Sequence, residues 1–370
     1  MIRYKFSKNI NVEFATALKN RVNAHFKDND LSRKANASMI RKTFLATGIY
    51  FALYFIILFS GITSVPLMFG FWILLGAAQA FIGMAVMHDV LHGSFSNNKT
   101  TNALMQIPVI AIGVESSLWQ LQHNVLHHTY TNIEHADEDI APRYVLRMTE
   151  NQPRRWFHRY QHYYVTFFYS LIVILWMTIK DFIKLRTYKK TGLITSNKEA
   201  LGTLFQIIIR RSLFYGVFLV IPLYALNFSP LLVVLMFVTM LAVSGLILSI
   251  VFQAAHIVPD CVTLQQDDKL INENWHVHQL MTTSNYATDN KLMTYFFGSL
   301  NFQVEHHLFP NICHVHYPAL SKIVKATAAE FNIPYNCQKT FSGAVKSHYK
   351  HLKELGRNDS VAVTSTFVYV

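Results

Sequence analysis

The hydrophobic pattern of the chain is dominated by four long apolar runs, which are grouped in two closely spaced pairs. The first pair covers residues 44–62 and 66–87, and the second pair covers residues 207–226 and 231–255. A helix of roughly 20 apolar residues crosses a bilayer core of about 30 Å. The polar gap inside each pair leaves room only for a tight turn. Each pair is therefore predicted to form an antiparallel membrane hairpin.

Two shorter apolar runs lie between these hairpins. Residues 103–114 are too few to cross a bilayer, so this run is predicted to be interfacial or buried. Residues 163–179 are at the lower limit for a crossing and have basic residues on both sides. A crossing there would leave one basic flank on the outer face and would place the histidine-rich segments on opposite faces. We therefore predict an interfacial amphipathic helix for residues 163–179.

The distribution of charge predicts the orientation of the hairpins. Their two turns carry no charge, while the other connections carry Lys or Arg. Because basic residues collect on the cytoplasmic side, both hairpins are expected to open toward the cytoplasm, with both termini there. The predicted fold is an all-α integral membrane protein with four spanning helices, interfacial helices and a cytoplasmic helical cap. We expect a basic cytoplasmic leader at residues 1–43, a membrane domain at 44–355 and a flexible tail at 356–370.

Composition supports a membrane protein. Hydrophobic residues make up 52% of the chain and charged residues 15%, whereas soluble domains carry about 25% charged residues. The formal net charge is +12, but the basic residues flank apolar runs and form no single dense patch. This favours a membrane surface over a nucleic-acid partner. The three cysteines are scattered and predict free thiols in a reducing compartment.

Histidines supply the candidate chemistry. The chain has 18 of them, and eight lie in four short segments that the predicted topology brings to one membrane face. These candidate metal ligands are His88, His92, His123, His127, His128, His256, His306 and His307. Residues four apart share a helix face, which suits several of these spacings. The convergence of four separate segments is a stronger signal than any one of them.

The number of histidines predicts the kind of centre. Imidazole suits Fe, Zn, Cu and Ni, and a single zinc ion takes four ligands. Eight ligands therefore fit two metals that each keep an open position. A hydrolytic zinc pair would need a water-activating carboxylate and a polar substrate. At a membrane edge, a pair of irons that activates dioxygen is the better match.

Three motifs in the chain resemble the histidine boxes of the membrane fatty acid desaturases. They are HDVLH at residues 88–92, HNVLHH at 123–128 and QVEHH at 303–307. Gln303 stands where many desaturases have histidine, which is similar to the front-end (linoleoyl-CoA desaturase-like) branch. The stretch NFQVEHHLFP at Asn301–Pro310 is similar to that branch too. The resemblance runs from about residue 44 to residue 335.

This resemblance implies a non-haem di-iron centre that uses O2 and two electrons. The reaction would remove two hydrogens from adjacent methylenes of an acyl chain carried on CoA or on a lipid. The eight histidines would be the iron ligands, and Gln303 occupies a further ligand position. The sequence contains no HPGG haem motif of a fused cytochrome b5. Electrons are therefore expected from a separate cytochrome b5 or ferredoxin with its reductase, and the basic cytoplasmic face could dock an acidic donor.

Other polar residues near the boxes have two interpretations each. His278, which precedes Gln279, is a candidate metal ligand or a support for one. Asp89 and Glu305 lie inside boxes and are expected to accept hydrogen bonds from metal-bound imidazoles. Three other carboxylates could serve this role equally well or could instead form salt bridges with Arg143 and Arg147. They are Glu134, Asp137 and Asp139. The histidines predicted to be interfacial or solvated, rather than ligands, are His135, His158, His162, His314 and His316. An aromatic belt at the interface is predicted for Trp119, Trp156, Trp176 and Trp275.

Related functions share this pattern. A membrane hydroxylase, a ketolase or a sphingolipid desaturase would use the same boxes. A metal transporter or a bis-histidine cytochrome would place histidines within the spanning helices, whereas here they lie at the ends. The position of the new double bond, the acyl carrier, the electron donor and the oligomeric state are left open by the sequence.

Overall fold

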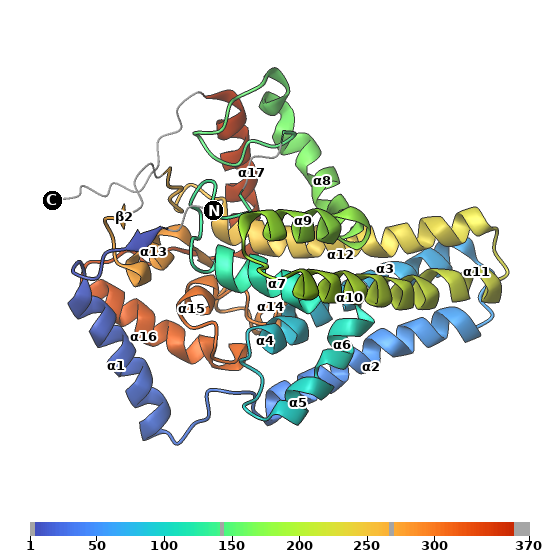
Figure 1. Cartoon of the computed structure of the whole chain (residues 1–370), viewed down its shortest axis with the longest axis horizontal. Helices are drawn as coiled ribbons and strands as arrows, with labels where there is room; N and C mark the ends of the chain where they lie inside the picture. The colour runs from blue at the N-terminus through green and yellow to red at the C-terminus, as the bar shows by residue number, and fades with distance from the viewer. Residues whose placement is uncertain (1–3, 141–143, 266–269, 359–370) are drawn as a thin grey trace. The chain divides into compact units, whose positions relative to one another are not determined.

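The computed structural model describes residues 4–140, 144–265 and 270–358, and it is built almost entirely of helices (Figure 1). The chain divides into two compact units, which are described separately. Arg143 and most of the predicted tail lie outside the described residues. Unit 1 comprises Met1–Ala35, Gln122–Val165 and Ile250–Val370, and unit 2 comprises Asn36–Leu121 and Thr166–Ser249.

Unit 2 contains most of the long apolar helices. It begins with α2 and α3, which form the first hairpin, and continues through short helices to α10 and the larger part of α12. The helices α8 and α12 each begin in one unit and end in the other. The elements are α2 (Ala37–Phe59), α3 (Val65–Ile82), η1 (Gly83–Met87), α4 (His88–Leu91), α5 (Lys99–Leu104), α6 (Gln106–Ala111), α7 (Ser116–Gln120), α8 (Gln161–Leu175), η4 (Trp176–Lys180), α9 (Asp181–Thr191), α10 (Asn197–Tyr215), η5 (Gly216–Val220), α11 (Ile221–Ala225) and α12 (Pro230–His256).

Five helices among the described residues are long and apolar enough to cross a membrane. They are Ala37–Phe59, Val65–Leu91, Trp156–Thr191, Asn197–Ala225 and Pro230–His256. Four of them contain the predicted spanning runs. The run at residues 163–179, predicted to be interfacial, belongs to the fifth, because the helix extends well beyond the apolar run on both sides. The four-span plan is therefore not confirmed. A further pair of short helices, Lys99–Ala111 and Ser116–His127, is bent by 98° and would add a sixth span only as a broken one.

Small residues allow close helix packing in unit 2. A Cβ atom on Gly76 of α3 would lie 2.4 Å from the carbonyl oxygen of Met240 in α12. A Cβ atom on Gly245 of α12 would lie 2.8 Å from the carbonyl oxygen of Ser170 in α8. Such contacts exclude any side chain larger than hydrogen. Glycines at these two positions therefore allow the backbones to pack directly, as is common between membrane helices.

One buried ion pair ties three segments of unit 2 together. The guanidinium of Arg211, in α10, donates to the carboxylate of Asp181 at the start of α9 and to the carbonyl oxygen of Gly113. It also donates to the carbonyl oxygen of Trp176 at 3.1 Å, and the Trp176 indole donates to Asp181 at 2.9 Å. Both terminal nitrogens of Arg211 and both carboxylate oxygens of Asp181 are thus engaged. Buried charges are tolerated only when they are paired and hydrogen-bonded in this way.

Replacing Arg211 by leucine is expected to destabilise the protein by about 3–5 kcal/mol, because Asp181 would stay buried without its partner. The free energy of unfolding in detergent micelles measures this loss. The matched control is Arg186→Leu, at an exposed position of α9, and it is expected to change stability little. Equal losses in the two variants would show that the ion pair has no special role.

Unit 1 contains the remaining elements, which are short apart from α1, α16 and α17. They are β1 (Lys5–Phe6), α1 (Val12–Asp28), η2 (Leu121–His127), η3 (Trp156–Tyr160), β2 (Leu270–Ile271), α13 (Trp275–Thr282), β3 (Asn285–Tyr286), α14 (Lys291–Phe296), α15 (Gln303–Leu308), η6 (His314–His316), α16 (Tyr317–Glu330), β4 (Cys337–Gln338) and α17 (Phe341–Arg357). Two short parallel strand pairs connect distant segments, with Lys5 opposite Leu270 and Asn285 opposite Cys337.

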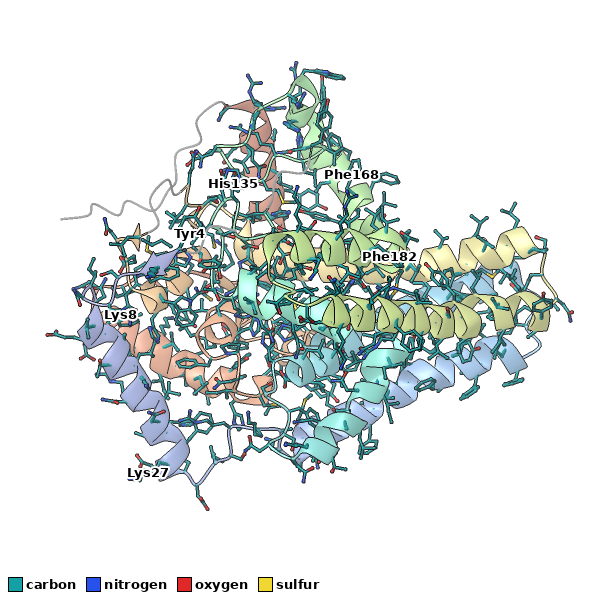
Figure 2. All side chains as sticks on the ribbon, in the orientation of Figure 1. Tyr4, Lys8, Lys27, His135, Phe168 and Phe182 are labelled. Atoms are coloured by element: carbon teal, nitrogen blue, oxygen red, sulfur yellow. The ribbon has the colours of Figure 1, made fainter. Side chains whose placement is uncertain are left out.

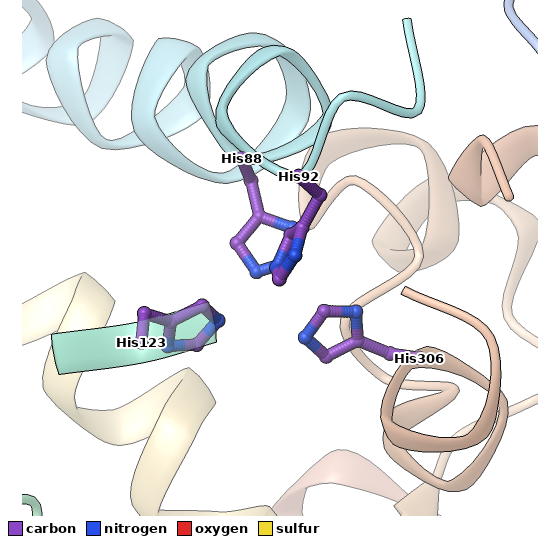
Figure 3. A group of neighbouring side chains, drawn as sticks. All are labelled: His88, His92, His123 and His306. Carbon is purple, nitrogen blue, oxygen red and sulfur yellow. The ribbon is translucent and has the colours of Figure 1, made fainter. Parts of the chain in front are cut away.

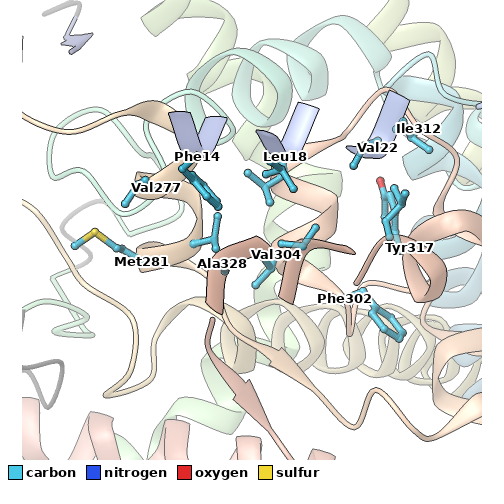
Figure 4. Close-up of a cluster of buried hydrophobic side chains, with 14 of the residues drawn as sticks. Phe14, Leu18, Val22, Val277, Met281, Phe302, Val304, Ile312, Tyr317 and Ala328 are labelled. Carbon is cyan, nitrogen blue, oxygen red and sulfur yellow. The ribbon is translucent and has the colours of Figure 1, made fainter. Parts of the chain in front are cut away.

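The main hydrophobic core of unit 1 joins the N-terminal helix to the third histidine box (Figure 4). On α1 the buried residues recur every four positions, at Phe14, Leu18, Val22 and Phe26. They form one cluster with residues of α13, α15 and α16. Most of the predicted basic leader is thus a structural part of the unit. Lys8, Lys19 and Lys27 remain exposed, with Lys8 and Lys27 near the two ends of α1 (Figure 2).

The C-terminal helix extends into the predicted tail. Helix α17 ends at Arg357, and Gly356 is buried against η3. A Cβ atom on Gly356 would lie 2.0 Å from the carbonyl oxygen of His158. This close approach fixes the end of α17 to the start of the helix that follows His158.

Candidate metal centre

The first histidine box lies at the end of an apolar helix in unit 2. Helix α3 passes through a π-helical turn, η1, into α4, which carries His88 and is capped by His92. The centroids of the two imidazole rings are 4.6 Å apart (Figure 3). Both rings contact Trp119, at 5.7 Å and 5.5 Å between centroids. The predicted pairing of His88 with His92 is therefore present in the fold.

The second box lies on a π-helical segment rather than an α-helix. Residues Leu121–His127 form η2, and the backbone N–H of His128 donates to the carbonyl oxygen of His123 at 3.0 Å, five residues back. An α-helix would turn His128 about 100° away from His127 and about 140° away from His123. The wider π turn instead brings the His123 and His128 rings to 4.8 Å. Single π turns of this kind are frequent at functional sites.

The third box and His256 come from two different helices, α15 and the end of α12 that lies in unit 1. Helix α15 begins at Gln303 and carries His306 and His307, both completely buried. His256 is the last residue of α12 and is also buried. The segments that carry these residues meet the second box within unit 1, where two groups of ring nitrogens converge.

The first group consists of His127, His256 and His307. One ring nitrogen from each lies within 4.8 Å of the others. The ring centroids are 4.8–4.9 Å apart in all three pairs. The three side chains are at most 1% exposed.

Each imidazole of this first group is oriented through its Nδ1 atom. His127 donates to the carboxylate of Asp137 at 2.9 Å. His256 donates to the carbonyl oxygen of Thr282 at 3.3 Å, and His307 donates to the side-chain oxygen of Gln279 at 2.9 Å. With the proton on Nδ1, each Nε2 presents a lone pair. Metal-bound histidines are held in this way by a carboxylate or carbonyl.

Helix α13 is the common support of this arrangement. Gln279 contacts His307, and the carbonyl of Thr282 accepts from His256. The indole of Trp275 donates to the carbonyl oxygen of His128 at 3.3 Å, and His278 donates to that of Thr131 at 2.8 Å. A single helix therefore positions the second box, the third box and His256.

The second group consists of His128, His306 and His307, whose ring nitrogens also lie within 4.8 Å of one another. His123 lies beside it, with its Nε2 3.3 Å from Nε2 of His128 and its ring stacked 5.8 Å from that of His306 (Figure 3). The hydroxyl of Tyr317 donates to the carbonyl oxygen of Phe309 and lies 3.4 Å from Nδ1 of His306. His307 belongs to both groups.

The donor set fits metal ions better than any hydrogen-bonding role. Nε2 of His127 is buried and has no hydrogen-bond partner among the described residues. An unsatisfied buried nitrogen costs free energy unless a ligand uses it. Several imidazoles that direct lone pairs at one point form a site for a cation such as iron or zinc.

Gln303 lies at the edge of the first group. Its side-chain nitrogen is 2.9 Å from Nε2 of His256 and 3.4 Å from Nε2 of His307. Its side-chain oxygen is buried and has no hydrogen-bond partner in the described part of the chain. Rotation of the amide by 180° would direct this oxygen toward the two imidazoles. The side chain thus lies next to the imidazoles of His256 and His307, and its role as a ligand stays a prediction.

His278 and Glu305 contact neighbouring segments. Burial lowers the pKa of His278 to about 4, so the ring is neutral and donates through Nε2 to the carbonyl oxygen of Thr131. The carboxylate of Glu305 accepts hydrogen bonds from Asn285 at 2.8 Å and Tyr335 at 2.9 Å. Burial raises the pKa of Glu305 to about 7 against the effect of these two donors. Both residues therefore fix the chain segments around the boxes.

The remaining carboxylates differ in their surroundings. Asp137 accepts from His127 and also from the backbone N–H groups of Asn132 and Asp139, each at 2.9 Å. The carboxylate of Asp139 is 3.7 Å from Nδ1 of His127. Glu134 instead accepts from the hydroxyl of Thr149, and Asp89 is buried within α4. Among the carboxylates with equal claims, Asp137 has the clearest contact with a box histidine.

Two residues of this network were not singled out from the sequence. Gln279 accepts from His307, and Thr131 donates to Gln279 at 2.9 Å and lies 3.1 Å from Nδ1 of His307. Gln279 directly follows the candidate histidine His278. No spacing or motif in the sequence, however, marks a glutamine that will be buried beside a metal ligand. Only the fold shows which side chain of α13 faces the third box.

Comparison with known proteins identifies the class. The model of the fatty acid desaturase family matches residues 63–339, so the chain belongs to this family. It is a multi-pass membrane enzyme of lipid metabolism.

The more similar relatives specify the branch. The chain is 33% identical to the sn-1 linoleoyl-lipid 6-desaturase of Arthrospira platensis, over 95% of each chain. It is 33% identical to the acyl-lipid (8-3)-desaturase of Physcomitrium patens, over 94% of this chain and 72% of that one. A sn-1 linoleoyl-lipid 6-desaturase of Synechocystis is also 33% identical, over 93% and 96%. These relatives confirm the similarity to the front-end branch that QVEHH predicted.

Proposed function

We propose that this chain introduces a double bond into a lipid-bound acyl chain at a pair of non-haem iron ions. When bound, the irons would supply the oxidising power of O2 and two electrons to remove two hydrogens from adjacent methylenes. The observation that carries the proposal is the convergence of buried imidazoles in unit 1, with Nε2 of His127 left without a hydrogen-bond partner.

The two groups of imidazoles suggest how the ligands are shared. His127, His256 and His307 would hold one iron, with the side-chain oxygen of Gln303 as an additional ligand. His128, His306 and His123 would hold the other. The family resemblance adds His88 and His92 of the first box to the ligand set. Oxygen and imidazole donors together suit non-haem iron.

The surrounding residues would keep the ligands neutral and oriented. Asp137, Gln279 and the carbonyl of Thr282 each accept a proton-bearing Nδ1, which keeps Nε2 deprotonated and directed at the metal. The site is buried, so bulk water is excluded from the oxidising centre. Methylene groups offer no polar handle, so positioning of the acyl chain would select the bond.

The relatives suggest the substrate. Two are named linoleoyl-lipid desaturases and one is named an acyl-lipid desaturase. We therefore favour a glycerolipid-bound polyunsaturated acyl chain over acyl-CoA. As a front-end enzyme, this chain would place the new double bond between an existing one and the carboxyl end.

The charge distribution suggests the orientation. The uncharged hairpin turns favour an outer location, which would place the metal centre and both described ends of the chain on the cytoplasmic side. Electrons would then come from a cytoplasmic donor such as cytochrome b5 or a ferredoxin with its reductase.

Expression in a host without polyunsaturated lipids tests this function. Cells supplied with linoleic acid are expected to accumulate a fatty acid with one more double bond on the carboxyl side, located by mass spectrometry of a nitrogen-containing derivative. The new product should appear first in the glycerolipid fraction. A hydroxylated product, or a new double bond confined to sphingolipids, would contradict the proposal and favour a related di-iron activity.

A further inference from the structure

A solvent-exposed surface of unit 1 combines arginines with aromatic rings. It is formed by the loop before η3 and by η3 itself. Trp156 is 77% exposed, Tyr144 66% and Tyr160 47%. We call it the basic aromatic surface, and its members are Tyr144, Arg154, Arg155, Trp156, Arg159 and Tyr160.

The charge of this surface is almost entirely positive. Between residues 144 and 164 the sequence has four arginines and a single acidic residue, Glu150. The neighbouring helix α17 adds Lys353 and Arg357, which act electrostatically on His162. The guanidinium of Arg155 lies 4.2 Å from the ring centroid of Tyr144, and that of Arg159 lies 5.2 Å from that of Tyr160. Arginines over aromatic faces form favourable cation–π contacts.

The backbone beneath this surface is firmly held. His158 accepts from the backbone N–H of Arg155 at 3.1 Å and contacts the carbonyl oxygen of Tyr144 at 3.1 Å. Gln161 donates to the carbonyl oxygens of Arg147 at 2.9 Å and Leu352 at 2.7 Å. Together with the close approach of Gly356 to His158, these contacts join the loop, η3 and α17. The arginines therefore project from a rigid platform.

Three residues of this surface, Trp156, Arg159 and Tyr160, lie at the start of a helix that is apolar enough to cross a membrane. The helix Trp156–Thr191 has 36 residues and is about 54 Å long. The hydrocarbon core is only about 30 Å thick, so the helix contacts the headgroup region whether it crosses the core or lies along the membrane surface. Tryptophan and tyrosine prefer the headgroup region, and arginine there pairs with lipid phosphates.

We propose that the basic aromatic surface binds the headgroups of anionic phospholipids. Charge complementarity favours an anionic ligand, and the exposed Trp156 and Tyr160 favour a lipid interface over a protein partner. The surface would hold unit 1 at the membrane. This inference concerns lipid binding and does not depend on the chemistry of the metal centre.

Native mass spectrometry of the full-length protein in detergent micelles tests this inference. Dioleoyl-phosphatidylglycerol and dioleoyl-phosphatidylcholine are added separately, and the dissociation constant of the first bound lipid is measured. The wild type is expected to prefer phosphatidylglycerol. We express the preference as the ratio of the dissociation constants for phosphatidylcholine and phosphatidylglycerol. In the triple variant R154Q/R155Q/R159Q this ratio is expected to fall at least about fivefold, which is the effect of about one arginine at a lipid surface.

The matched control removes the same charge from another helix. K8Q/K19Q/K27Q changes three exposed lysines on or beside α1 and is expected to keep the lipid preference. An unchanged preference in the arginine variant would overturn the proposal. So would loss of binding to an acidic cytochrome b5 with no loss of phosphatidylglycerol binding, since the surface would then serve the electron donor.

A second measurement tests whether the basic aromatic surface lies at the depth of the lipid headgroups in a bilayer. In nanodiscs that contain phosphatidylcholine brominated near the glycerol backbone, tryptophan emission of the wild type is expected to be quenched. Trp156→Phe should remove a component of the quenched emission. If the emission lost in this variant is unquenched by the brominated lipid, Trp156 faces water and the proposal fails.

Discussion

Replacing His127 by alanine is expected to lower desaturase activity at least about a thousandfold while leaving the protein folded and inserted. His127 is the one imidazole of the first group that is held by a carboxylate on one side and has an unused nitrogen on the other. Loss of this nitrogen would remove one of the three imidazoles that converge in the first group. Product formation in cells supplied with linoleic acid measures the effect.

His135→Asn is the matched control for this experiment. His135 lies eight residues further along the chain and is exposed (Figure 2). Its φ angle is 64°, a left-handed conformation that asparagine adopts readily. This variant should retain nearly full activity. Full activity in His127→Ala would remove His127 from the centre.

Replacing Gln279 by leucine is expected to weaken iron binding about 10- to 100-fold. The side-chain oxygen of Gln279 accepts the Nδ1 proton of His307 at 2.9 Å, and His307 belongs to both groups of imidazoles. Leucine fills a similar volume but removes the acceptor, so the ring could rotate or change tautomer. Iron affinity is measured by competition with a chelator of known affinity, separately from activity.

Two further variants separate positioning from general stability. Gln279→Glu keeps an acceptor oxygen and is expected to restore most of the iron affinity. Gln152→Leu removes another buried amide of unit 1, one that donates to the carbonyl oxygen of Ile140 at 2.8 Å. This control should lower stability but leave the iron affinity of the folded protein unchanged. Equal iron loss in both leucine variants would show that Gln279 acts only through stability.

The sequence predicted the histidine boxes because each has a short, regular spacing. His88 and His92 are four residues apart at the end of an apolar run, and the fold brings their rings together as expected. The spacing of His123 and His128 did not predict how close their rings lie, because an α-helix would point them in different directions. The π turn of η2 depends on backbone hydrogen bonds, and no residue pattern in this segment predicts them.

The supporting contacts were less predictable. Asp137 was one of several carboxylates with equal claims, and only the loop after the second box decides that it faces His127. Gln279 lies 28 residues before His307, and the contact arises from the packing of α13 on α15. Such contacts depend on tertiary structure and leave no periodic signal.

The membrane plan was partly predictable. Apolar length located four of the candidate spans, but the fifth was predicted to be an interfacial helix because its apolar run is short and has basic residues on both sides. The helix that contains residues 163–179 continues into polar sequence at both ends, which composition windows do not detect. The N-terminal leader was predicted from its charge, whereas the four-residue repeat from Phe14 to Phe26 shows that one face of α1 is buried.

The metal content of the active enzyme shows whether the buried histidines hold a pair of irons. Protein purified in detergent is analysed for iron by mass spectrometry and, in parallel, for activity with a reduced electron donor. We expect about two irons per folded chain, with activity rising in proportion to the iron content. Full activity with one iron or fewer per chain, or with zinc in its place, would contradict it.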